Sequence, residues 1–353
     1  MTLLPQAFDH TAALRAIAAK WAEVPTDALD RALHEATYPV YAKALSVSPK
    51  TRPAAEVFSL EQLRAALDAG DPAAFDVALE VLGRSLPAES VVALATAIDS
   101  TSPWKRLRNL AYEMVAPLST EASFRFLLSH PYASHLYGKS AYADGETLAY
   151  ERLLASPLYE LELPPPTRKA LANLSADALD AAEAEREALL EPIDPDELRI
   201  TEDLVTFLLS KGSERARAAG RKLVETSPED GIRGRAASGL IDAGHREDLE
   251  FMAGYLDDAD TAIRQSAIHA VLMLDPTKAW ERLNGDRLMQ PGAEADAEEL
   301  LYELGRDLAG TGGQPVRGWA KQDPRWAELA RKWLPNKKMK QPIFVLQGLG
   351  EKL

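Results

Sequence analysis

The chain has 353 residues, 46% of them hydrophobic and 27% charged, which is the balance of a folded protein with a large core. Its formal net charge of −14 argues against a nucleic-acid backbone as the main partner, because phosphate binding requires clustered positive charge. The complete lack of cysteine excludes disulfides, thiolate metal sites and cysteine nucleophiles. It also fits a reducing compartment, so we expect a cytoplasmic protein.

No stretch of the sequence predicts export or a membrane span. The longest apolar run, Val91 to Ile98, is interrupted by one threonine. A spanning helix requires about 20 predominantly apolar residues, so this run is far too short. Asp9 and His10 precede the first basic residue, Arg15, which is the reverse of a secretory signal. We therefore expect no membrane partner.

Helical spacing of Ala, Leu, Glu and Arg, cut at intervals by Pro and Gly, dominates the first half of the sequence. Leu60, Leu63 and Leu67 form one apolar stripe, and Asp71-Pro72 then supplies a cap and a first-turn proline for another helix. Helix pairs of weak regularity are expected over 72–98 and 103–130. Residues 1–163 are accordingly predicted to form an N-terminal helical domain.

The segment 129–142 differs from the rest of this half, since it collects two His, three Tyr and one Lys. Such side chains combine an apolar body with a polar tip, as binding surfaces require. The alternative is an irregular loop whose tyrosines cover the adjacent helices. The candidate binding residues of this segment are Tyr132, His135, Tyr137 and Tyr142.

A break follows at Leu163 to Pro166, where three consecutive prolines predict a stiff, non-helical stretch. The segment 177–203 then carries eleven acidic residues against Arg186 and Arg199. Residues 164–200 are therefore predicted to form a linker and a solvated helix. The alternative is an acidic surface that recruits a basic partner.

Two copies of one pattern stand out in the second half. Ile-Arg-x-x-Ala-x-x-x-Leu begins at Ile232, and the same pattern with a final Val begins at Ile263. The apolar positions share one helix face, and the central alanine, Ala236 in the first copy, lets neighbouring helices approach. The arginine of each copy is placed to reach carboxylates such as Asp258, and Asp260 is placed to cap the helix that follows.

The stretches 231–244 and 260–275 resemble the HEAT-repeat family, particularly its short bacterial form related to phycobilin-lyase repeats. The resemblance covers about 201–283. It implies an all-α fold, a helical-repeat solenoid of antiparallel helix pairs, with a break between two halves. Members are mostly scaffolds and partner-binding proteins. The HEAT-like hydroxylases hold iron with several His-Glu pairs, of which this sequence has His34-Glu35 alone.

Residues 201–353 are predicted to form a C-terminal domain that ends in a capping helix and a tail. Trp319, Trp326 and Trp333 recur every seven residues, which suits a helix that covers the exposed end of a stack. An aromatic ligand platform is the alternative. The run from Pro342 to Gln347 carries the most convincing strand pattern in the sequence.

We expect a non-enzymatic scaffold or adaptor that binds a basic protein or peptide on its concave surface, as an antitoxin or immunity protein would. The alternative is a HEAT-like enzyme, either a lyase or isomerase acting on a bulky ligand or a nucleic-acid repair glycosylase, with His135, Tyr137 or Asp144 as the acid/base group. No His, Asp or Glu spacing predicts a metal site, and no cofactor is expected. The rim or floor of the concave surface is predicted to contain Glu250, Tyr255, Lys278 and Trp280.

Overall fold

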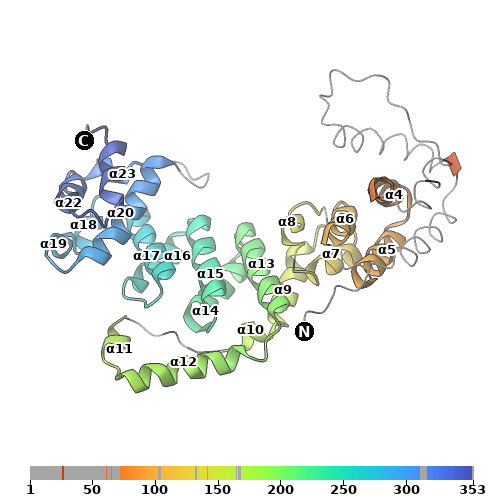
Figure 1. Cartoon of the computed structure of the whole chain (residues 1–353), viewed down its shortest axis with the longest axis horizontal. Helices are drawn as coiled ribbons and strands as arrows, with labels where there is room; N and C mark the ends of the chain where they lie inside the picture. Colours follow the sequence, from red (N-terminus) through yellow and green to blue (C-terminus); the bar gives the residue numbers. More distant parts are fainter. Residues whose placement is uncertain are drawn as a thin grey trace. The chain divides into compact units, whose positions relative to one another are not determined.

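The structure is a computed structural model of the chain. It describes residues 26–27, 61, 65, 72–101, 105–131, 133–140, 142–163, 165, 168–310 and 316–351. Within these residues the fold is all-α, as the sequence predicts, and contains no strand (Figure 1). None of the described helices combines the length and the apolar character required to cross a bilayer.

The chain divides into two compact units, Met1–Arg152 and Leu153–Leu353. The proline stretch after Leu163 therefore belongs to the second unit. In the first unit α5 packs on α6 and α7, and α4 packs on α6. The helices of this unit are α4 (Pro72–Ser85), α5 (Ala88–Thr101), α6 (Lys105–Val115), α7 (Glu121–Leu128), α8 (Ser134–Tyr137) and α9 (Gly145–Leu154), whose last residues cross the boundary.

The second unit contains a longer run of helices. They are α10 (Pro157–Glu160), α11 (Arg168–Ala172), α12 (Ala176–Leu190), α13 (Pro195–Lys211), α14 (Glu214–Thr226), α15 (Asp230–Ala243), α16 (Arg246–Met252), the 3₁₀ turn η1 (Ala253–Tyr255), α17 (Thr261–Leu274), α18 (Ala279–Arg282), α19 (Gly285–Leu288), α20 (Glu294–Ala309), α21 (Trp319–Gln322), α22 (Arg325–Trp333) and α23 (Gln341–Gly348).

Local capping explains where several of these helices begin and end. Asp260 caps α17, as predicted, by accepting a hydrogen bond from the Ala262 backbone N–H at 2.8 Å. The helices α13 and α15 both end at a glycine in the left-handed region, Gly212 and Gly244, each with φ +68°. A glycine is favoured there because other residues are strained at positive φ.

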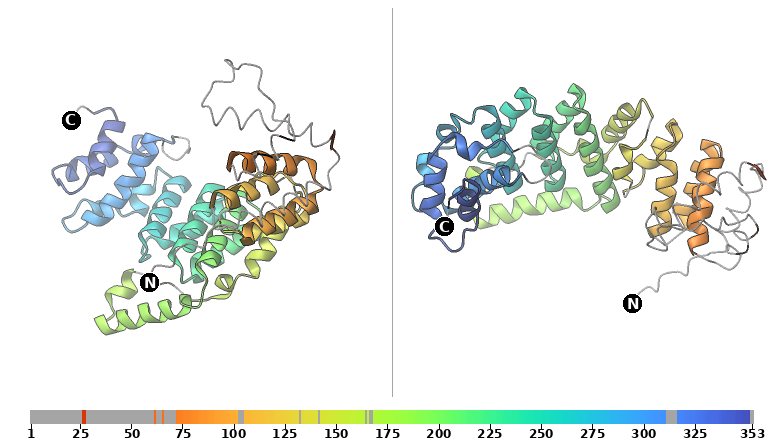
Figure 2. Two further views of the ribbon diagram at one scale, coloured as in Figure 1. Left: turned by 45° about the vertical axis from the view of Figure 1, so that its right-hand side comes forward. Right: turned by 90° about the horizontal axis from the view of Figure 1, so that it is seen from above.

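The helices α13, α15, α17 and α20 form one row. In sequence order each contacts the next, and the successive helices lie side by side in both views of Figure 2. Between α17 and α20 the pairings run in the same direction along both helices, since Arg264 pairs with Glu299 and His269 pairs with Glu303, so these two helices are parallel. In the sequence α14 lies between α13 and α15, and α16 lies between α15 and α17.

Buried ion pairs tie neighbouring helices of this stretch together. Arg217 on α14 donates to Asp248 on α16 at 2.7 Å, and Asp248 is fully buried. Arg233 on α15 donates to Asp258, ahead of α17, at 2.8 Å, and both side chains are buried. This last contact confirms the predicted reach of the repeat arginine to a carboxylate. Arg264 on α17 donates to Glu299 on α20, at 3.0 Å from Nε.

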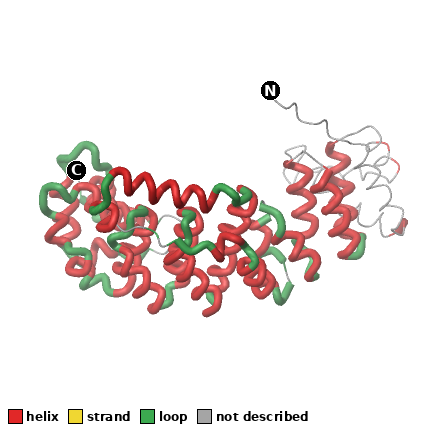
Figure 3. Tube along the Cα trace, turned by 90° about the horizontal axis from the view of Figure 1, so that it is seen from below, coloured by secondary structure: helices red, strands yellow, loops and turns green. Residues whose placement is uncertain are grey.

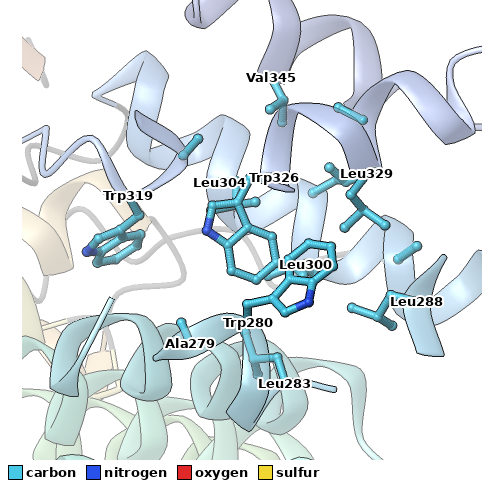
Figure 4. Packing of buried hydrophobic residues seen from close by; sticks show 14 of the residues in the cluster. Ala279, Trp280, Leu283, Leu288, Leu300, Leu304, Trp319, Trp326, Leu329 and Val345 are labelled. Carbon is cyan, nitrogen blue, oxygen red and sulfur yellow. The ribbon is translucent and has the colours of Figure 1, made fainter. Parts of the chain in front are cut away.

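The C-terminal end of the second unit has an aromatic core instead (Figure 4). Trp280 and Trp326 pack with their ring centroids 4.8 Å apart, and Trp326 is completely buried. Trp333 is buried beside them and donates its indole N–H to the Leu288 carbonyl at 2.9 Å. As expected, Trp326 and Trp333 share the buried face of α22 with Leu329.

The predicted strand at Pro342 to Gln347 is wrong, because these residues lie in α23. Pro342 occupies the first turn, where its missing N–H costs no hydrogen bond. Val345 and Leu346 fall on the same face of the helix as Pro342 and are buried. Since α23 packs on α20 and α22, its apolar run covers a helix surface rather than a sheet.

The helix α12 lies apart from the row of α13, α15, α17 and α20 (Figures 1 and 3). None of its side chains is buried. Arg186 fastens it by donating to the Pro228 carbonyl at 2.6 Å and pairing with Asp230 at 2.7 Å. This exposure agrees with the solvated helix that the sequence predicts, and it fits the alternative of an acidic recruiting surface equally well.

Candidate functional site

A groove of about 360 Å³ lies between α13 and α15. The two helices approach closely there, because a Cβ on Gly239 would lie 2.6 Å from Cδ1 of Leu209. Beside this contact the facing side chains are short, so the groove stays open. Its lining is Thr206, Leu209, Ser210, Arg235, Ser238, Gly239, Asp242 and Ala243.

The groove has a mixed polar and apolar lining that carries both signs of charge. Thr206 and Ser210 donate their hydroxyl hydrogens to carbonyls of their own helix, at 3.0 and 2.6 Å, which leaves their oxygens free to accept. Arg235 is 55% exposed and lies 4.0 Å from Glu202, so it is only loosely paired. Such a lining offers hydrogen-bond acceptors and charges to the amides and charged side chains of a polypeptide.

Polar contacts also join α17 to α20 further along the row. The Nδ1 atom of His269 lies 3.1 Å from the Glu303 carboxylate, which is 2% exposed, and Arg306 lies 3.8 Å from the same carboxylate. The edge of the imidazole meets Trp319 with ring centroids 4.8 Å apart. His269 occupies the position in α17 that Ser238 occupies in α15, according to the sequence repeat.

The predicted aromatic segment of the first unit mainly faces its core. Tyr137 is 2% exposed and packs on Phe124 with centroids 6.2 Å apart, while half-buried Tyr142 lies 6.1 Å from the same ring. His135 is exposed on α8. Tyr132 lies outside the described residues. The structure therefore brings two of the four predicted side chains together around Phe124.

A histidine in the same segment is held at both ring nitrogens. Nδ1 of His130 lies 2.5 Å from the Phe126 carbonyl, and Nε2 lies 2.9 Å from the Asp99 carboxylate. The Tyr112 hydroxyl donates to the other oxygen of Asp99. Both ring nitrogens of His130 are therefore engaged, and the side chain joins α5 to the end of α7.

The four binding residues predicted in the second unit do not line the groove. Exposed Glu250 pairs with Arg246 at 2.9 Å, and exposed Lys278 pairs with Asp275 at 3.5 Å. Tyr255 is half-buried and lies over Phe251, and burial is the main cause that raises its pKa to about 12. The fourth residue, Trp280, is buried in the C-terminal core.

Within the part of the chain that the structure describes, no three His, Asp or Glu side chains gather closely enough to hold a metal ion. The sequence analysis did not select the groove residues. Arg235 and Ser238 belong to the repeat pattern, but that pattern specifies buried positions and says little about which exposed positions face an opening. A signal was available in Gly239, a helical glycine with no turn to explain it.

No protein-family model, curated protein or solved structure matches the chain. The function is therefore argued from the chemistry of the described residues. These residues include a groove between α13 and α15 that is lined by hydroxyls, apolar side chains and both signs of charge.

Proposed function

We propose that this protein is a non-enzymatic scaffold of HEAT-like repeats that binds a basic protein or peptide along the row of α13, α15, α17 and α20. The spacing of paired residues supports the repeat. Arg217 and Asp248 are 31 residues apart, His269 and Glu303 are 34 apart, and Arg264 and Glu299 are 35 apart. A solenoid of helix pairs has a period in this range.

The groove between α13 and α15 is the observation that carries the binding proposal. It is formed by α13 and α15, two helices of the second unit, and its lining includes hydroxyls, a carboxylate and an arginine. An extended chain laid along the row would meet acceptors at Thr206 and Ser210 and charges at Arg235 and Asp242. A repeat array provides extended area of this kind for a polypeptide ligand.

The preference for a basic partner rests on charge. The exposed acids of α12 form no ion pair within the described residues, and the whole chain carries a net charge of −14. Unneutralised acids on a protruding helix attract a cationic partner at long range and accelerate its encounter. The acids concerned are Asp177, Asp180, Glu183, Glu185 and Glu187.

The first test is capture of partners from a lysate of the source organism by the full-length protein, at low and high salt, with identification by mass spectrometry. The expected result is one abundant basic protein whose capture weakens at high salt, because screening removes the long-range attraction. Capture of acidic proteins alone, or of none under either condition, would contradict the proposal.

Two variants then distinguish the contribution of the α12 acids to partner binding from that of the groove. Neutralising Asp180, Glu183 and Glu187 to the amides is expected to slow association several-fold at low salt and to leave dissociation nearly unchanged. The matched control neutralises three exposed acids elsewhere, Glu247, Glu294 and Glu328.

Filling the groove with Ser238→Tyr is expected to weaken binding at both salt concentrations. The new side chain would block short-range contacts in the groove and would leave the long-range electrostatic attraction unchanged. Ser238 is exposed, so the substitution leaves the core intact. Unchanged affinity of this variant for the captured partner would show that the partner binds elsewhere.

A further inference from the structure

A second cavity, of about 260 Å³, lies between α17, α20 and the short helices α18 and α19. Its volume is near the lower end, about 300 Å³, of ordinary small-molecule pockets. Part of its lining is apolar and buried. These apolar side chains are Ile268, Leu283, Leu288 and Leu300.

The wall of this cavity that contains α18 and α19 is fixed from behind by the tryptophan core. The Trp280 indole donates to Asp286 at 3.1 Å, and a Cβ on Gly285 would overlap the Trp280 ring. Asn284, which lines the cavity, has φ 51° and is the one residue other than glycine at positive φ in the described chain. Because Trp333 also holds the Leu288 carbonyl, the wall is preformed.

Most charged groups that line this cavity are already paired. Arg287 pairs with Asp296 at 2.6 Å, and Glu299 accepts from Arg264 at 3.0 Å. Two exposed groups remain, Asp257 and Arg282, and within the described residues neither forms an ion pair or a side-chain hydrogen bond. The cavity therefore offers one free anion and one free cation beside an apolar lining.

We infer that this cavity binds a small zwitterion with an apolar side chain, of the class of a free aliphatic amino acid. The Arg282 guanidinium matches the fork geometry of the ligand carboxylate, and the Asp257 carboxylate accepts from the ligand ammonium. The hydrocarbon part packs on Ile268 and Leu300.

The charges of the lining argue against the other common ligand classes. A phosphorylated ligand would bring two or more negative charges to a cavity with one free arginine and three carboxylates, Asp257, Asp296 and Glu299. A bare metal ion would find only one carboxylate that is not already paired. A purely apolar ligand would make no use of the charges of Asp257 and Arg282.

The test is calorimetric titration of the full-length protein with L-leucine and two analogues of the same shape, 4-methylpentanoate without the ammonium and 3-methylbutylamine without the carboxylate. Saturable binding of L-leucine is expected, with each analogue weaker by about tenfold or more, because each leaves one charged group without its hydrogen bonds. No saturable binding of L-leucine, or equal binding of an analogue, would overturn the inference.

Variants locate the site. Arg282→Gln and Asp257→Asn are each expected to weaken L-leucine binding by about tenfold, while Arg246→Gln, an exposed arginine on α16, leaves it unchanged. Retained binding in Arg282→Gln would overturn the assignment. Ser238→Tyr should leave L-leucine binding intact, so failure of the amino-acid site and failure of the scaffold proposal are separate results.

Discussion

Two neighbouring regions of the second unit hold their helices together by different means. From α13 to α17 buried arginine–carboxylate pairs supplement an apolar core, and they are represented by Arg217 with Asp248 and Arg233 with Asp258. From α18 to α23 they are tryptophans in an apolar core, and Trp280 and Trp333 also donate indole hydrogen bonds to the chain. Both regions are all-helical, so they differ in the type of contact between helices and not in secondary structure.

A buried ion pair adds little net stability, because desolvating the two charges offsets their attraction, but it is costly when misaligned. The arginines of α13–α17 therefore fix how one helix pair is placed on the next. An aromatic core gains free energy from buried area and tolerates small shifts. We expect the placement of the helices in the row to depend on the ion pairs. The stability of the C-terminal end should depend on the volume of its buried side chains.

The largest expected effect comes from emptying the aromatic core. Trp326→Ala should lower the free energy of unfolding by about 3–5 kcal/mol, because a completely buried ring is replaced by a cavity. Urea unfolding followed by circular dichroism measures it. The control is Phe344→Ala, at a side chain that is 55% exposed, with an expected loss below about 1 kcal/mol. Equal losses in the two variants would show that this core does not dominate the C-terminal end.

Breaking an ion pair in the row should cost slightly less. Asp258→Ala leaves the Arg233 guanidinium, which is 2% exposed, without its carboxylate, and we expect a loss of about 3 kcal/mol. The double variant Arg233→Met with Asp258→Leu should recover most of that loss, because no charge then remains buried. A double variant as unstable as the single one would show that the site requires the pair for stability and not only for placement.

Sequence patterns predict the ion-paired region, α13 to α17, better than the aromatic region, α18 to α23. The Ile-Arg-x-x-Ala pattern places Arg233 and the cap at Asp260 correctly, since short-range periodicity determines both. The run at Pro342 was assigned to a strand because β-branched and aromatic residues are common in strands. Pro342, Val345 and Leu346 also fit one face of a helix, and the packing of α23 on α20 and α22 decides between the two.

The candidate site is harder to predict for a related reason. Tyr137 and Trp280 have the composition of binding residues, yet their side chains are buried, because a large amphipathic ring serves a core equally well. The groove at Ser238 and the cavity at Arg282 are formed by helices that are distant in sequence. Their openings depend on how one helix pair is rotated against the next, and one sequence does not specify that rotation.

A smaller effect should appear within α15, which offers a matched pair of glycines. Gly239→Ala is expected to destabilise by about 1–2 kcal/mol, because its Cβ would lie 2.6 Å from Leu209. Gly234→Ala meets no atom within 4 Å and should stabilise by about 0.5–1 kcal/mol through helix propensity. Thermal unfolding of both variants tests the packing of α13 on α15, and changes of the same sign would contradict it.

The smallest effect concerns Tyr255, which lies in η1 between α16 and α17, within the ion-paired region. Burial, and after it the charge of Glu225, raises the pKa of this phenol to about 12 from an ordinary value of about 10. The folded state therefore favours the protonated phenol, so its contribution to stability is complete below pH 10 and is lost as the pH rises toward 12. Tyrosinate absorbance titrations of the protein and of Tyr255→Phe isolate this group.

The same titration reports on the buried pair. The charge of Asp258 raises the pKa of Tyr255 and that of Arg233 lowers it. Removing the carboxylate in Asp258→Asn takes away a raising charge and leaves Arg233 unneutralised, so the pKa of Tyr255 should fall. In Trp326→Ala no charge near Tyr255 changes, and its pKa should stay at about 12. A fall in both variants would mean that the two regions are not distinct, and that loosening either one exposes the phenol.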